Sequence, residues 1–217
     1  MKLKSKLLII AGSDSSGGAG IQADIKTATS LGVYAMTAIT AITAQNTTGV
    51  KSIVTVPPKE IFNQISFSVQ DIKPNSVKIG MLHNVGVIKE VIKAIKKHNL
   101  KNIVIDPVMV AKGGHRLIGS SSINYLRKKL LPFALLVTPN IPEAEALIKK
   151  KIKTLDDVIN AGKEILKFGP KFVLIKGGHT NKSFIEDVLI SKNNIKIFKN
   201  KKIISARIIS NSKYSRS

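Results

Sequence analysis

Three chemically reactive side chains lie just beyond apolar runs that are typical of β-strands. Asp106 directly follows one run, Glu143 lies shortly after a second, and Lys176 directly follows a third. Ligands of open α/β sheets bind at the carboxyl ends of the strands, so these side chains are candidates for one site. Two carboxylates suit a hydrated Mg²⁺ that also takes phosphate oxygens, and a lysine can neutralise a nucleotide phosphate.

Each of these residues also has a plain structural interpretation. Asp106 could be a solvated loop residue ahead of the glycine-containing segment 112–114. Asn140 and Glu143 have the spacing of a helix N-cap and its reciprocal partner. Lys176 is one of 35 basic residues, most of which are expected to be solvated.

A run of small residues, Gly12-Ser13-Asp14-Ser15-Ser16-Gly17-Gly18-Ala19-Gly20, follows the first apolar segment and precedes a helix expected from about Ile21. Such a loop lets backbone N–H groups approach an anionic ligand. It is no Walker A loop, because no Gly-Lys-Ser/Thr follows. It meets a relaxed dinucleotide fingerprint, but the acid expected about 20 residues on is absent between Asp24 and Glu60. A tight turn without a ligand is the alternative.

Asp24, about one turn into that helix, and Gln45, late in an uncharged segment, add a carboxylate and a carboxamide. Together they offer the acceptor and donor pattern that suits an aminopyrimidine edge. Alone, Asp24 could equally be a carboxylate that faces the positive end of the helix dipole.

The elements that must position these groups alternate between strand-like and helical patterns. Strands are expected at Leu7–Ala11, Val33–Thr43, Val50–Val56, Ser76–Ile79, Asn102–Ile105, Ala134–Val137 and Phe172–Ile175, and helical periodicity covers Val87–Ile95 and Leu155–Leu166. Alternation of this kind predicts one α/β domain with parallel strands joined by right-handed crossovers. Towards the end, Phe184–Ser191, Ile195–Lys199 and Lys201–Ile209 read as an antiparallel edge around a turn at Asn193-Asn194.

Composition narrows the class of protein. The chain has 217 residues, 43% of them hydrophobic, which places it in the globular range. It has no cysteine, which excludes disulfides, thiolate metal sites and a thiol nucleophile. The net charge of +22 comes mostly from scattered lysines with few aromatics, a pattern that argues against a nucleic-acid partner. The apolar run Leu7–Ala11 is too short for a signal peptide, and the uncharged stretch Thr27–Val50 reads as a buried strand, so we expect a cytoplasmic protein.

Six segments occur in an order that resembles a known family. They are Ala11-Gly12-Ser13-Asp14-Ser15-Ser16-Gly17-Gly18-Ala19-Gly20-Ile21-Gln22-Ala23-Asp24, Thr43-Ala44-Gln45-Asn46-Thr47, Lys78-Ile79-Gly80-Met81-Leu82, Asp106-Pro107-Val108-Met109, Thr138-Pro139-Asn140-Ile141-Pro142-Glu143-Ala144 and Lys176-Gly177-Gly178-His179. The set resembles the hydroxymethylpyrimidine/phosphomethylpyrimidine kinases of thiamine biosynthesis, a ribokinase-like family, from the first strand to about residue 205.

This resemblance implies a three-layer α/β fold with a mostly parallel central sheet over residues 1–205. It also implies transfer of the ATP γ-phosphate to 4-amino-5-hydroxymethyl-2-methylpyrimidine and then to its monophosphate, with a homodimer as the usual assembly. The residues that it assigns to the pyrimidine are Gln45, Asp24, Gly12, Met81 and Val108. Those assigned to ATP are Asn140, Glu143 and Lys176, and those assigned to Mg²⁺ are Asp106 and Glu143.

The chain departs from the family pattern at its end. Relatives continue past the strand near Ile203 into an Asn-Thr-His-Gly-Thr-Gly-Cys segment that supplies the anion hole and the base, whereas residues 206–217 form a divergent tail. We therefore expect a kinase that is C-terminally truncated, impaired and without a catalytic residue of its own. Lys213 to Arg216 match the family tetrapeptide read one base early, which suggests a frameshift. The alternatives are a pyridoxal-type kinase and a non-catalytic remnant that binds the pyrimidine, or RNA through Lys192–Arg216.

Overall fold

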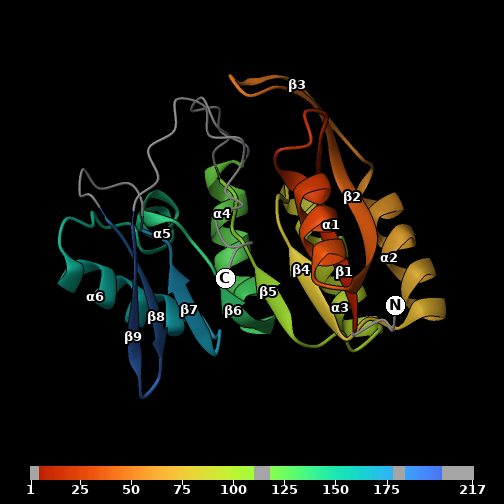
Figure 1. Ribbon diagram of the computed structural model, residues 1–217. Helices are drawn as coiled ribbons and strands as arrows, with labels where there is room; N and C mark the ends of the chain where they lie inside the picture. Colours follow the sequence, from red (N-terminus) through yellow and green to blue (C-terminus); the bar gives the residue numbers. More distant parts are fainter. Residues whose placement is uncertain (1–4, 110–117, 178–183, 202–217) are drawn as a thin grey trace.

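The computed structural model describes residues 5–109, 118–177 and 184–201. Within these residues nine strands form one sheet, in the order β3-β2-β1-β4-β5-β6-β7-β8-β9 (Figure 1). The strands are β1 (Ser5–Asp14), β2 (Val33–Gln45), β3 (Val50–Thr55), β4 (Ser76–Ile79), β5 (Ile103–Ile105), β6 (Ala134–Val137), β7 (Phe172–Ile175), β8 (Phe184–Ser191) and β9 (Ile195–Lys201).

The sheet is parallel in its centre and antiparallel at both edges. Strands β2, β1, β4, β5, β6 and β7 pair in parallel, while β8 and β9 form the antiparallel edge that the sequence predicts. The expectation that parallel strands alternate with helices is wrong for β3, which pairs antiparallel with β2. Only residues 46–49 connect these two strands, and a parallel crossover needs a dozen residues or more.

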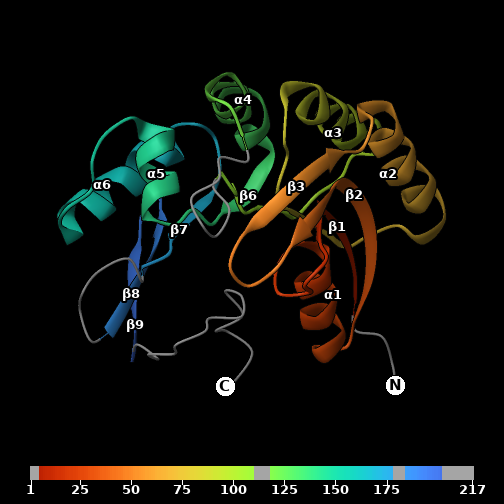
Figure 2. The ribbon, with the colours of Figure 1, turned by 90° about the horizontal axis from the view of Figure 1, so that it is seen from above.

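Helices cover both faces of the sheet, as the three-layer prediction requires (Figure 2). Helix α1 (Gly20–Ser30) lies on one face, where Ile21 packs with Ile9 and Ala11. The other face carries α2 (Pro58–Ile72), α3 (Val85–Lys97), α4 (Ser120–Tyr125), α5 (Ile141–Ile148) and α6 (Leu155–Leu166). A π-helical turn (Leu126–Leu130) and a 3₁₀ turn (Leu131–Phe133) lead into β6.

Periodicity accounts for the longer helices. In α3, Val87, Ile88, Val91 and Ile95 are buried in the main core, as the spacing predicts. Helix α6 follows the N-cap Thr154; the side chains of Thr154 and Asp157 each accept from the other's backbone N–H. None of the helices in the described ranges is long and apolar enough to cross a bilayer.

Strand β1 is the centre of the topology. The chain leaves β1 through α1 on one face to reach β2, and it enters β4, on the other side of β1, through α2 on the opposite face. The carboxyl end of β1 is therefore a topological switch point, where open α/β sheets bind ligands. The small-residue loop 15–19 lies there, between β1 and α1.

Gly20 allows α1 to begin in contact with β1. Its φ of +56° lies in the left-handed region, and a Cβ at this position would lie 2.3 Å from the carbonyl oxygen of Gly12. Both the backbone conformation and the close approach therefore exclude a side chain.

We predict that Gly20→Ala lowers the free energy of unfolding by about 2 kcal/mol or more, because it adds left-handed strain to a steric clash with backbone. Urea denaturation measures this change. Gly49→Ala is the matched control: a Cβ there meets no atom within 4 Å, so the effect should stay within about 0.5 kcal/mol. Equal stability of the two variants would contradict this account of the start of α1.

Candidate active site

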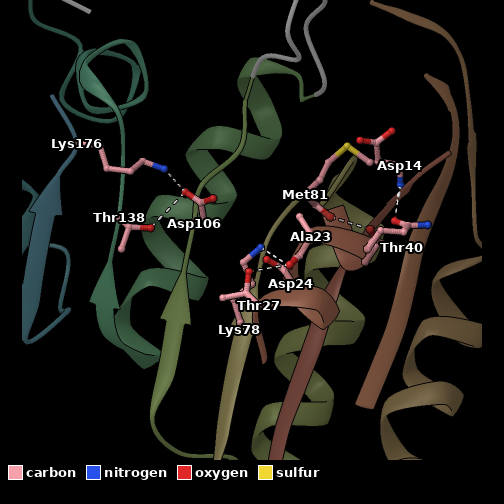
Figure 3. Close-up of polar contacts among 11 residues, drawn as sticks. Asp14, Ala23, Asp24, Thr27, Thr40, Lys78, Met81, Asp106, Thr138 and Lys176 are labelled. Carbon is pink, nitrogen blue, oxygen red and sulfur yellow. Dashed lines mark hydrogen bonds and ion pairs between the residues drawn. The ribbon is translucent and has the colours of Figure 1, made fainter. Parts of the chain in front are cut away.

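Asp106 and Lys176 form an ion pair at the carboxyl edge of the sheet. The Nζ of Lys176 lies 2.7 Å from the Oδ1 of Asp106, and the hydroxyl of Thr138 donates to the same oxygen at 3.2 Å (Figure 3). The three residues follow the adjacent strands β5, β6 and β7, which explains why segments distant in sequence meet. The first and last of the three sequence-predicted groups are thus brought together.

Ladder-like backbone bonds continue past the strands and fix this meeting point. The N–H of Asp106 donates to Ile79, that of Thr138 donates to Ile105, and that of Lys176 donates to Pro139, over 2.8 to 2.9 Å. The side chains are therefore held on short extensions of the sheet rather than on long loops.

Glu143 joins the pair from the first turn of α5. The capping interpretation is confirmed, because Asn140 Oδ1 accepts from the N–H of Glu143 and Glu143 Oε2 accepts from the N–H of Asn140. Glu143 is only 5% exposed. Burial and then the negative charge of Asp106 raise the pKa of its carboxyl to about 7, although bonds from backbone N–H groups and the charge of Lys176 act in the opposite direction.

This pair of carboxylates fits Mg²⁺. Asp106 and Glu143 are close enough to repel one another, and a cation between phosphate oxygens and these groups would relieve that repulsion. The described part of the chain holds no group of three or more His, Cys, Asp or Glu side chains suited to a metal. A magnesium ion here would therefore depend on phosphate and water for its remaining ligands, which is its usual mode.

The backbone of the small-residue loop folds around the side chain of Asp14. Asp14 is 3% exposed, and its carboxylate accepts from the N–H groups of Ser16, Gly18 and Ala19 and from the Ser16 hydroxyl, over 2.7 to 3.0 Å. These three amides are therefore not available to an external anion. For them the interpretation as an anion-binding loop is wrong, and the tight-turn alternative describes the structure.

Asp24 and Gln45 occupy different surroundings. Asp24 forms an ion pair with Lys78 of β4, with 2.6 Å between Oδ2 and Nζ, on the face that carries α1 (Figure 3). Gln45 ends β2, and its backbone N–H and carbonyl both bond the Ser15 hydroxyl at 2.9 Å. No recorded contact in the described ranges joins Asp24 to Gln45, so their joint role at a pyrimidine stays a prediction.

The three remaining pyrimidine candidates lie together. Met81 is buried against Ala41, and Val108 packs on this pair. Met81 also lies against Gly12, since a Cβ on Gly12 would meet the methyl group of Met81. The hydroxyl of Thr40 donates to the Met81 carbonyl at 2.7 Å and holds this segment to β2. An apolar wall thus forms beside the switch point.

Asp187 is a site residue that sequence reasoning missed. It is 2% exposed, and its Oδ1 accepts from the N–H of Gly177 at 2.7 Å, next to Lys176. Burial raises the pKa of the Asp187 carboxyl. A Cβ on Gly177 would meet the carbonyl of Glu186, so β8 packs directly on this segment. An acid inside the apolar run of β8 was the available signal.

Several predicted features lie outside the described residues. They are the segment Lys112-Gly113-Gly114, Gly178 and His179, the expected strand beyond Lys201 and the divergent tail at 206–217.

We predict that Glu143→Gln raises the free energy of unfolding at pH 8. The folded state keeps the Glu143 proton at pH values where the unfolded chain has already ionised. The free energy of unfolding therefore falls as the pH rises, because ionisation favours the unfolded chain, and the loss is complete above about pH 7. Glutamine removes that cost and can still accept from Asn140. The gain should be about 2 to 3 kcal/mol at pH 8 and should fall to below about 1 kcal/mol near pH 5.

Glu145→Gln on the same helix is the control, with the opposite sign. The hydrogen bond from Lys151 and the backbone bond from Ile152 lower the pKa of the Glu145 carboxyl. Its ionised form therefore favours folding, and its removal should lower stability at pH 8. Chemical denaturation at both pH values measures the two variants, and a destabilised Glu143→Gln at pH 8 would refute the assignment.

Comparison with known proteins shows that this chain is similar to kinases. The family model described as phosphomethylpyrimidine kinase matches residues 14–208. The hydroxymethylpyrimidine/phosphomethylpyrimidine kinase of Bacillus subtilis is 47% identical over 174 residues, which cover 80% of this chain and 64% of that protein. The chain thus spans less than two thirds of the length of this curated relative.

Solved structures agree with the architecture. A phosphomethylpyrimidine kinase from Clostridium difficile superposes with a TM-score of 0.83 at 49% identity and covers 90% of this chain and 84% of its own. An ADP complex of Bacillus subtilis pyridoxal kinase gives a TM-score of 0.85 at 38% identity and covers 93% of this chain and 77% of its own.

Proposed function

We propose a function for this chain on one premise: the chain belongs to the phosphomethylpyrimidine kinase family, whose model matches residues 14–208. The proposed reaction is transfer of the ATP γ-phosphate to 4-amino-5-hydroxymethyl-2-methylpyrimidine, and then to its monophosphate. The chain is similar both to pyrimidine kinases and to a vitamin kinase with bound ADP, which supports ATP as the donor.

The observation that carries this proposal is the segment Asp106-Pro107-Val108. Asp106 pairs with Lys176 on the charged side of the site, whereas Val108 packs on the buried pair Ala41 and Met81 in the apolar wall. The N–H of Val108 donates to the Asp106 carbonyl at 2.8 Å, which makes this connection a tight turn. A small ring against the wall would therefore lie close to phosphates held by the charged cluster.

Such a site promotes phosphoryl transfer by positioning and charge neutralisation. Lys176 would bind phosphate oxygens; its own N–H donates to Pro139, and the N–H of the next residue, Gly177, donates to Asp187. Asp106 and Glu143 would hold Mg²⁺, which neutralises phosphate charge when bound. Asn140 would act indirectly, by capping α5 and so positioning Glu143, because its side-chain oxygen already accepts from the N–H of Glu143.

By resemblance to the family, we further propose a homodimer that works in the cytoplasm.

Pyridoxal phosphorylation is the second candidate, because the ADP-bound pyridoxal kinase shares this fold over 93% of the chain.

The RNA-binding alternative depends on Lys192–Arg216, most of which lies outside the described residues. Within the described part of that stretch, Lys199 already pairs with Glu186 at 3.1 Å.

We predict that the chain, whose rate the divergent residues 206–217 are expected to lower, phosphorylates the hydroxymethylpyrimidine in preference to pyridoxal. Lys176→Met should lower kcat/KM by a further factor of about 10² or more through loss of phosphate neutralisation. An ATP-dependent assay with each substrate measures both. Lys171→Met, at an exposed lysine just before β7, should leave the rate unchanged. A preference for pyridoxal would establish the second candidate instead.

A further inference from the structure

The Ser15 hydroxyl takes the place of a strand residue beside Gln45. The parallel ladder between β1 and β2 ends at the pair Asp14 and Thr43. Beyond it, Ser15 Oγ accepts from the N–H of Gln45 and donates to its carbonyl, both at 2.9 Å. Because a hydroxyl both donates and accepts, one side chain satisfies both backbone groups of Gln45.

Pairing on the other side of Gln45 is irregular. The antiparallel register between β2 and β3 shifts between Ala44 and Gln45, and Gln45 faces Val50 across this bulge. Bulges next to active sites redirect side chains, and they leave the local backbone less constrained than a regular ladder. The contact with Ser15 therefore constrains the backbone of Gln45 where the sheet does so least.

The Gln45 side chain itself is weakly held. Its Oε1 lies 3.4 Å from the Thr43 hydroxyl, whose shorter bond, 2.8 Å, goes to the Ser13 carbonyl. The direction of the carboxamide therefore depends mainly on the position of its own backbone. Ser15 is positioned in turn by the loop closed on the buried Asp14 carboxylate.

We propose that Ser15 is a positioning residue that determines specificity: by fixing the backbone of Gln45, it directs the Gln45 carboxamide towards the amino group of the pyrimidine. This inference rests on the proposed function, in which Gln45 contacts that ring. Ser15 itself need not touch the substrate, and its effect is on discrimination between ligands rather than on folding.

The test is calorimetric binding of two compounds to the 217-residue chain. The probes are 4-amino-5-hydroxymethyl-2-methylpyrimidine and its analogue without the amino group. Wild type should prefer the amino compound by about 10-fold, the worth of one good hydrogen bond. Ser15→Ala should reduce this preference to about 2-fold or less, mainly by weaker binding of the amino compound.

Two variants separate positioning from general damage. Ser15→Thr keeps a hydroxyl at an exposed position and should restore the preference. Ser30→Ala also removes a hydroxyl that donates to a backbone carbonyl, at the far end of α1, and should leave the preference at the wild-type value. All three variants should melt within a few degrees of wild type, because both serines are exposed.

The outcomes distinguish the inference from the function on which it rests. If wild type prefers the amino compound and Ser15→Ala keeps that preference, the inference is overturned and the proposed function stands. The same holds if wild type binds both compounds equally, since Gln45 then does not read the amino group. Failure of wild type to bind either compound would overturn the proposed function and the inference with it.

Discussion

The ion pair between Lys176 and Asp106 is the constraint on which the rest of the site depends. The site gathers two acids, Asp106 and Glu143, in a partly buried place, and burial together with the repulsion from Asp106 raises the pKa of Glu143 to about 7. Lys176 offsets that repulsion from the neighbouring strand at 2.7 Å. Two acids beside one lysine fit the proposed binding of a metal together with a triphosphate.

Buried acids have a consistent use in this basic chain. Among the described residues, the buried charged side chains are Asp14, Glu143 and Asp187, and each accepts from at least one backbone N–H near the carboxyl edge of the sheet. The acids thus satisfy amide groups where strands end and the ladder bonds run out. Burial of these carboxylates costs stability, as the raised pKa values of Glu143 and Asp187 show. Their hydrogen bonds in turn make the edge that carries the functional groups more rigid.

The same edge joins two chemically different halves. In the apolar wall, Ala41 lies on β2 and Met81 follows β4, whereas the charged cluster follows β5, β6 and β7; Val108, shortly after β5, packs on the wall. Parallel strands end at one edge, so the ring and the triphosphate of the proposed reaction would meet at that edge without a long connection between the halves. The tight turn at Asp106 and the contact of the Ser15 hydroxyl with Gln45 show how local hydrogen bonds to the backbone, rather than long loops, set distances at this edge.

Much of this could be predicted from the sequence, since apolar runs and helical spacing reflect burial directly. The bounds expected for Ala134–Val137, Phe172–Ile175 and Phe184–Ser191 are those of β6, β7 and β8, and parallel order alone brings Asp106 and Lys176 to one edge. Periodicity did not predict the helix Pro58–Ile72, the antiparallel pairing of β3, or the partners of Asp14, Asp24 and Asp187. Those partners depend on which segments meet: Asp24, for example, pairs with Lys78, which lies 54 residues away in the sequence. A polar group in a chain has many potential partners of the right type, and only the packing of helices on the sheet decides which one lies within hydrogen-bonding distance.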